Sequence, residues 1–251
     1  MNGIGTRSVC VAFWRGLLGL LLPARCALCE AALAPAEPGG LCGPCRGRLP
    51  AIRQPYCPRC GTQVYGAVPV PFDTLCGGCR VRSPRFGTCR SAGRYEGPLR
   101  ECVHLLKFRD RRDLAEPLGA FMAESFAREC PGASYDALVP VPISPERRRE
   151  RGFNQSLDLA LVLGRFAGIA VEKRALARRG GRPSQRALSK AQRRQNVRGE
   201  FAVSDARLVA GRRLLLVDDV YTTGATAAEC VSTLLAAGAA GVDVYTLARG
   251  E

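Results

Sequence analysis

Two adjacent carboxylates, Asp218 and Asp219, stand between an apolar run and a turn made of small hydroxyl residues and glycine. Paired carboxylates can accept hydrogen bonds from sugar hydroxyls, or hold Mg²⁺ through water. The turn offers backbone N–H groups at the start of a helix-like run, a favourable place for a phosphate, and Gly224 lets a ligand approach the backbone closely. A molecule with adjacent ribose hydroxyls and a 5′-phosphate would satisfy both parts. The candidate phosphate-binding residues are Thr222, Thr223, Gly224, Ala225 and Thr226.

The segments before and after the acidic pair and the turn must hold these groups in position. Residues 214–217 are a continuous apolar run, which predicts a strand buried on both faces of a parallel sheet. The sequence from residue 225 to about residue 237 predicts a helix. Open α/β sheets bind ligands at the carboxyl ends of their strands, and the acidic pair is predicted to lie there. The alternative is an ordinary strand, turn and helix in which Asp218 is a capping or solvated residue.

The run from residue 214 to residue 226 resembles the phosphoribosyl pyrophosphate (PRPP) signature of type I phosphoribosyltransferases. The resemblance implies that Asp218 and Asp219 bind the ribose 2′ and 3′ hydroxyls at the catalytic centre, and that the following loop binds the 5′-phosphate. It also implies that Mg²⁺ accompanies PRPP and that Val141 lies in a loop that touches the pyrophosphate. Tyr221 departs from the pattern, because an aliphatic residue is more usual there.

Eight of the thirteen cysteines form four pairs, each with two residues between its members. This spacing lets both thiolates of a pair reach one ion, and two pairs complete a closed tetrahedral site, so we predict about two structural Zn²⁺ ions. Short loops close most readily, which favours pairing in sequence order over a cross-braced arrangement. Disulfides are the alternative and would require an oxidising compartment. The predicted ligands are Cys26, Cys29, Cys42, Cys45, Cys57, Cys60, Cys76 and Cys79.

The chain of 251 residues carries a formal net charge of +15, and the excess is concentrated. Residues 145–199 contain fifteen Lys or Arg against four Asp or Glu, which predicts attraction to pyrophosphate, nucleotides or nucleic acid. In this region Arg151 and Arg193 are candidate phosphate ligands and Asn154 is a candidate hydrogen-bonding partner. Residues 178–198 are predicted to form a mobile lid over the phosphate site. The alternative for these arginines is a solvated surface.

The remaining pattern alternates strands with helices, which predicts a mostly parallel sheet. Lys107 closes one of the predicted helices and can reach an anion. At the N-terminus Arg15 interrupts the apolar run, so we expect a short helix rather than a signal peptide or a membrane span, and a cytoplasmic protein. The predicted strands cover residues 88–95, 135–142, 199–203 and 241–247, and the predicted helices cover residues 98–108, 113–130 and 147–166.

Together these motifs resemble the ComF/GntX family, in which a zinc-ribbon segment is joined to a phosphoribosyltransferase-like domain. The resemblance covers nearly all of the chain after about residue 20. It implies a role in natural competence, in handling DNA that enters as a single strand, or in using DNA as a nutrient. Besides the cysteine pairs and the acidic loop, it rests on residues 95–100, 106–108, 139–142 and 151–155, and on Gln185, Leu188, Arg193, Asn196 and Val197.

We therefore predict an α/β fold: a phosphoribosyltransferase-like, mostly parallel sheet with flanking helices, preceded by a small Cys-rich zinc-ribbon segment. The predicted divisions are an N-terminal helix over residues 1–22, a double zinc ribbon over residues 23–84 and a phosphoribosyltransferase-like domain over residues 85–251. Three functions fit the sequence: phosphoribosyl transfer from PRPP, non-catalytic binding of single-stranded DNA or a nucleotide, and an adaptor whose zinc ribbons dock a helicase or DNA-uptake protein.

Overall fold

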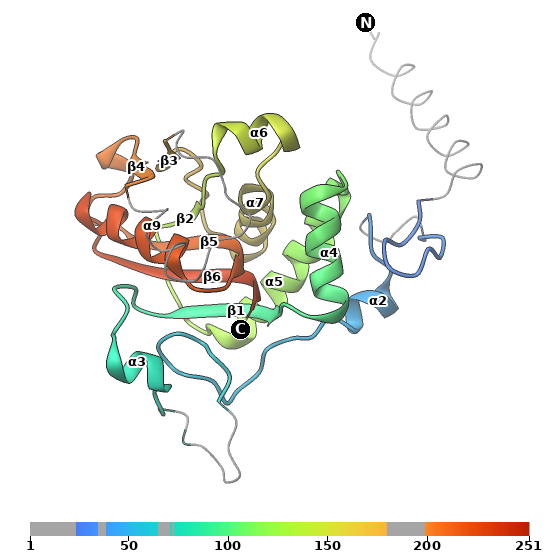
Figure 1. Ribbon diagram of the computed structural model, residues 1–251, viewed down its shortest axis with the longest axis horizontal. Coiled ribbons are helices and arrows are strands. Elements are labelled where there is room, and N and C mark those ends of the chain that lie inside the picture. The colour runs from blue at the N-terminus through green and yellow to red at the C-terminus, as the bar shows by residue number, and fades with distance from the viewer. Residues whose placement is uncertain (1–23, 35–38, 65–70, 72, 180–198, 251) are drawn as a thin grey trace, which may run out of the picture.

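The computed structural model describes residues 24–34, 39–64, 71, 73–179 and 199–250 (Figure 1). The predicted N-terminal helix, Arg193 and most of the predicted lid lie outside these residues. Within them no helix is long and apolar enough to cross a membrane. The short helical turns and the small second sheet are α2 (Gly43–Gly47), α3 (Gly77–Val81), η1 (Arg112–Leu114), η2 (Ala206–Leu208), β3 (Leu176–Arg178) and β4 (Phe201–Val203).

A sheet of four parallel strands forms the centre of the molecule. The strands lie in the order β1 (Cys89–Arg94), β6 (Gly241–Arg249), β5 (Arg213–Tyr221) and β2 (Ala137–Pro140). This arrangement, with its flanking helices and Cys-rich N-terminal segment, confirms the predicted fold class. The predicted strand near residue 201 is present as β4, but it pairs antiparallel with β3 outside the main sheet.

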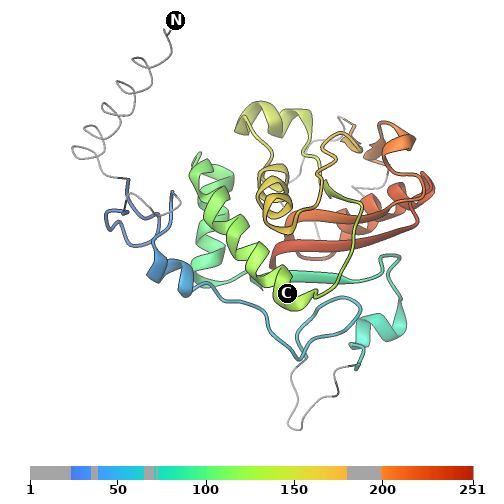
Figure 2. The ribbon, with the colours of Figure 1, turned by 180° about the vertical axis from the view of Figure 1, so that it is seen from behind.

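Helices cover the two faces of this sheet and define two hydrophobic cores (Figures 1 and 2). The first core lies between the sheet and three helices, and includes Leu106, Met122 and Leu159. The second core lies between the sheet and one helix and includes Val231 and Leu234. The helices of the first core are α4 (Gly97–Phe108), α5 (Ala115–Glu129) and α7 (Gln155–Ala167), and the helix of the second core is α9 (Ala225–Ala236).

The predicted helix over residues 147–166 is wrong in one respect, because the structure divides it into α6 (Pro145–Arg151) and α7. Gly152 ends α6 with a left-handed φ of 73°, a conformation that glycine adopts without steric cost. Asn154 then begins α7, and its side chain accepts a hydrogen bond from the Ser156 N–H. An N-cap of this kind satisfies a backbone donor that the first helical turn leaves free.

Both cysteine-rich segments pack against the sheet domain. Cys26 and Cys45 belong to the first core, whereas Cys57 and Cys60 belong to the second. The two segments therefore contribute buried side chains to the cores on opposite faces of the same sheet. Their cysteines also have the spacing of metal ligands.

Candidate functional site

The strand that carries the acidic pair is longer than predicted. It pairs with β2 only as far as Val217, but with β6 as far as Tyr221, so Asp218 and Asp219 lie inside β5 and beyond the end of β2. The alternation of side chains also shifts at the pair. Before it, Val217 packs in the first core; after it, Val220 packs against the first core and Tyr221 against the second. The shift turns Tyr221 toward the second cysteine-rich segment.

Two helices of the first core hold the acidic pair. The Lys107 ammonium of α4 lies 2.9 Å from Asp219 Oδ2, and both side chains are largely buried. The Ser156 hydroxyl, in the first turn of α7, donates to Asp218 Oδ1 at 2.9 Å, and the Asp219 N–H donates to the same oxygen at 2.9 Å. The acidic pair is thus fixed by groups from three elements.

Burial raises the pKa of Asp218 to about 7, and the adjacent negative charge of Asp219 adds to the shift. The hydrogen bond from Ser156 and the charge of Lys107 act in the opposite direction. A ligand that donates hydrogen bonds to the ionised carboxylate, or a cation beside it, would stabilise the charged form. Asp218 therefore lies at the carboxyl end of the sheet, and its ionised form would be stabilised by such a ligand.

This raised pKa predicts a pH-dependent stability effect for Asp218→Asn. The unfolded carboxyl ionises near pH 4, so between about pH 4 and pH 7 the folded chain binds more protons, and the carboxyl destabilises the fold increasingly as the pH rises. We expect the variant to gain stability over the parent on going from pH 4.5 to pH 8, by on the order of 3 kcal/mol. Urea denaturation at the two pH values measures the difference.

Asp205→Asn provides a comparison, because hydrogen bonds to Arg207 lower the pKa of Asp205 in the folded chain. That carboxylate stabilises the fold above its unfolded pKa and loses this contribution in acid, the reverse of Asp218. An Asp218→Asn variant whose stability difference from the parent is the same at both pH values would show that folding does not raise the pKa of Asp218.

The predicted phosphate loop joins β5 to α9. Gly224 has a left-handed φ of 71° and immediately precedes the helix, and the Thr223 hydroxyl oxygen accepts from the Ala225 N–H at 3.4 Å. A Cβ at Gly224 would overlap the Tyr221 hydroxyl. Glycine is thus required here for both its backbone conformation and the space it leaves. The loop presents the N-terminus of α9, where backbone N–H groups and the helix dipole favour an anion.

The other predicted ligand-binding residues occupy different positions. The Asn154 amide donates to the Val141 carbonyl at 3.1 Å, and the Val141 N–H donates to the Val217 carbonyl at 2.9 Å, so these groups hold the end of β2 against β5. Arg151 lies with its guanidinium 5.0 Å from the Phe108 ring centroid. Burial lowers the pKa of Arg151, and Arg147 adds to this effect. The roles of these residues toward a ligand stay predictions.

Two residues near the site, Ser156 and Arg249, were not singled out from the sequence. Ser156 is one of many serines and gives no signal before α7 places it beside Asp218. Arg249, the last residue of β6, lies 4.7 Å over the Tyr221 ring and donates to the Cys60 carbonyl at 2.7 Å. Arg249 therefore connects the end of β5, just before the phosphate loop, to the second cysteine-rich segment, although Cys60 is 189 positions away in the sequence.

The eight predicted metal ligands form two clusters of four, paired in sequence order. In each cluster the Sγ atoms lie within 4.8 Å of one another. The Cys29 and Cys42 sulfurs are 3.7 Å apart, and those of Cys60 and Cys76 are 3.6 Å apart. A tetrahedral zinc with Zn–S bonds of about 2.3 Å places its sulfurs about 3.8 Å apart, so the donor sets fit structural zinc.

Backbone donors favour the thiolate form at one cysteine of each cluster. Burial opposes ionisation of Cys26, but N–H groups of Cys42, Leu28 and Cys29 lower its pKa to about 6. N–H groups around Cys57 likewise lower the pKa of that thiol to about 6. Such donors are typical of zinc knuckles, because they stabilise sulfur in the charged form that binds the metal.

Comparisons with known proteins found a matching family model, similar curated proteins and similar solved structures. A family model described as "Double zinc ribbon domain" matches residues 17–82. DNA utilization protein YhgH of Salmonella typhimurium is 34% identical over 234 residues, which cover 92% of this chain and 99% of that protein. Among solved structures, the Bacillus subtilis glutamine PRPP amidotransferase in complex with ADP and GMP is 26% identical, with a TM-score of 0.36 over 53% of this chain and 26% of that one.

A second relative is Competence protein F of Haemophilus influenzae. It is 31% identical over 231 residues, which cover 90% of this chain and 96% of that protein. Both relatives are therefore matched over nearly their whole length, through the cysteine clusters, the sheet and the acidic loop alike. The chain belongs to the ComF/GntX family.

Proposed function

We propose that this chain binds a phosphorylated ribose, with PRPP and Mg²⁺ as its ligand, and that it serves the uptake or processing of DNA. The acidic pair of β5, followed directly by the loop at the N-terminus of α9, is the observation that carries the proposal. Asp218 and Asp219 would accept from the ribose hydroxyls, and residues 222–226 would hold the 5′-phosphate. The name of the first relative, DNA utilization protein, supports the connection with DNA, and the name of the second, Competence protein F, supports a role in competence.

Phosphoribosyl transfer is the reaction that this arrangement would support. In it the bond between the ribose anomeric carbon and pyrophosphate breaks, and the carbon becomes cationic as pyrophosphate leaves. The protein would then act by positioning the ribose at the acidic pair and by neutralising charge. Mg²⁺ would supply positive charge to the pyrophosphate. Arg151, which interacts electrostatically with Asp219, would add to it.

Calorimetric titration of the zinc-loaded protein with PRPP and Mg²⁺, at a stated salt concentration, tests the proposal. We expect saturable binding with about one site per chain, because β5 provides one acidic pair and one loop. A protein that holds a short single strand of DNA but does not bind PRPP would instead be a nucleic-acid-binding module that has kept the fold, as the second predicted function requires.

A further inference from the structure

A cavity of about 600 Å³ lies between the phosphate loop and the second cysteine-rich segment. One wall is the loop from Thr222 to Ala225 and the adjoining face of α9. The opposite wall is the second cysteine cluster and the residues that follow it, Arg82 to Phe86. The volume is in the range of sites that bind small organic ligands.

The acidic pair lies outside this cavity, so a ligand that contacts both the pair and the loop can bind in only one orientation. Asp218 and Asp219 contact α4 and α7, whereas the cavity is bounded by α9 and the cysteine-rich segment. A ribose 5-phosphate with its sugar at the acidic pair and its phosphate at the loop would thus have the cavity beyond the phosphate. Any group attached to that phosphate would enter the cavity.

The walls suit a polyanionic chain. Arg82 and Arg85 are exposed on the cavity wall and form no ion pair with any residue that the structure describes. Residues 57–90 contain five arginines and one acidic residue, so the segment stays positive even with the formal charge of minus two on a zinc–tetrathiolate site. The one carboxylate in the lining, Glu229, accepts from the Gly199 N–H at 2.7 Å.

A second cavity, of about 550 Å³, continues along the same segment. It shares Thr62, Thr222 and Arg249 with the first, and Tyr95 contributes an aromatic surface to its wall. Two adjoining cavities beside one phosphate loop provide more length than a single sugar phosphate needs. Arginines with occasional aromatic side chains are the surface on which single-stranded nucleic acid binds.

We propose that the site binds the 3′ end of a single-stranded nucleic acid. The terminal sugar lies at Asp218 and Asp219, its 5′-phosphate lies at the Thr222–Thr226 loop, and the preceding nucleotide occupies the cavity beside Arg82 and Arg85. The polarity follows from the position of the carboxylates, which accept from a free 3′ hydroxyl and repel a 3′-phosphate. This inference rests on the proposed phosphorylated-ribose site and names the class of ligand that fills it.

The test uses the full zinc-loaded chain and a fluorescent single-stranded oligonucleotide with either a 3′ hydroxyl or a 3′-phosphate. We expect the 3′ hydroxyl form to bind about tenfold or more tightly than the 3′-phosphate form, and PRPP to displace it, because the two ligands share the loop. Arg82→Ala/Arg85→Ala is expected to weaken oligonucleotide binding about tenfold, to reduce the magnitude of its salt slope by about 1.4, and to leave PRPP affinity unchanged.

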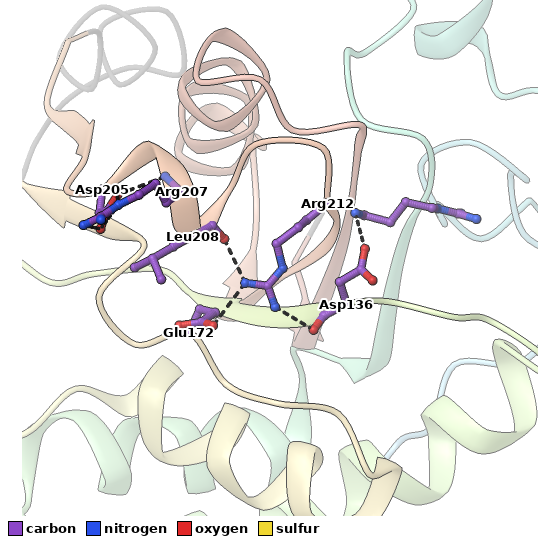
Figure 3. A network of polar contacts seen from close by, with 7 residues as sticks. Asp136, Glu172, Asp205, Arg207, Leu208 and Arg212 are labelled. Atoms are coloured by element: carbon purple, nitrogen blue, oxygen red, sulfur yellow. Dashed lines mark hydrogen bonds and ion pairs between the residues drawn. The ribbon is translucent and has the colours of Figure 1, made fainter.

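Lys173→Ala/Arg174→Ala is the matched control. Both residues are exposed cations near the opposite edge of the sheet, directly after Glu172, whose carboxylate accepts from Arg212 at 3.1 Å (Figure 3). An equal loss of affinity in this control, equal binding of the two oligonucleotides, or failure of PRPP to compete would overturn the inference. Absence of PRPP binding to the parent chain would instead reject the proposed phosphoribosyl ligand, a separate result of the same titrations.

Discussion

Asp218→Asn/Asp219→Asn is expected to reduce the affinity for PRPP at least a hundredfold while the fold is retained. Each carboxylate would lose charge-assisted hydrogen bonds to the ribose, worth about 1.5–3 kcal/mol each, and two such losses correspond to roughly a hundredfold or more. The asparagine oxygen at position 218 can still accept from Ser156 and from the backbone at position 219, so local structure is preserved. Calorimetry with PRPP and Mg²⁺ measures the affinity.

Two controls make the result specific to the acidic pair. Circular dichroism and the thermal midpoint test whether the double variant is folded, since Lys107 loses its ionic partner in this variant. The control variant Asp113→Asn/Asp205→Asn removes the same amount of negative charge, from two ion pairs at the surface. It should leave the affinity for PRPP unchanged. Unaltered binding in a folded Asp218→Asn/Asp219→Asn protein would show that the ligand lies elsewhere.

Local sequence was sufficient for the parts of the site that lie close together along the chain. The acidic pair, the loop and α9 are continuous in sequence, and a buried parallel strand has a recognisable apolar run, so their order predicted their arrangement. The cysteine pairs were equally direct, because two-residue spacing constrains the knuckle and the intervals between pairs favour neighbours. Both features could be read without knowing the rest of the fold.

The groups that complete the site come from distant positions, and the local sequence does not say which residues they contact. Lys107 reaches Asp219 only because α4 packs beside β5, and Arg249 meets Cys60 only because the end of β6 lies against the second cysteine-rich segment. Asn154 shows a second problem: the sequence indicated a ligand contact, which stays a prediction, but gave no sign that its side chain caps α7 and donates to Val141. Capping and ligand binding use the same residue types, so composition does not separate them.

Loss of zinc is expected to unfold much more than the cysteine-rich segments. Structural zinc contributes apparent free energies of about 10–16 kcal/mol in small domains, comparable to or larger than the total stability of a typical protein, about 5–15 kcal/mol. Cys45 packs in the first core and Cys57 in the second, on opposite faces of the sheet. Chelation should therefore expose both cores, with a loss of cooperative thermal unfolding measured by calorimetry.

Single ligand variants divide this effect between the two clusters. Elemental analysis of protein purified without chelator should give about two equivalents of zinc per chain, and about one for Cys45→Ser or Cys57→Ser. Cys130→Ser is the matched control, because Cys130 is partly buried but belongs to neither cluster, and it should keep both equivalents. Near-zero zinc in the parent protein would contradict the assignment.

Because Arg249 contacts Cys60 and Tyr221, we expect Cys57→Ser to impair ligand binding at the loop more than Cys45→Ser at equal residual stability.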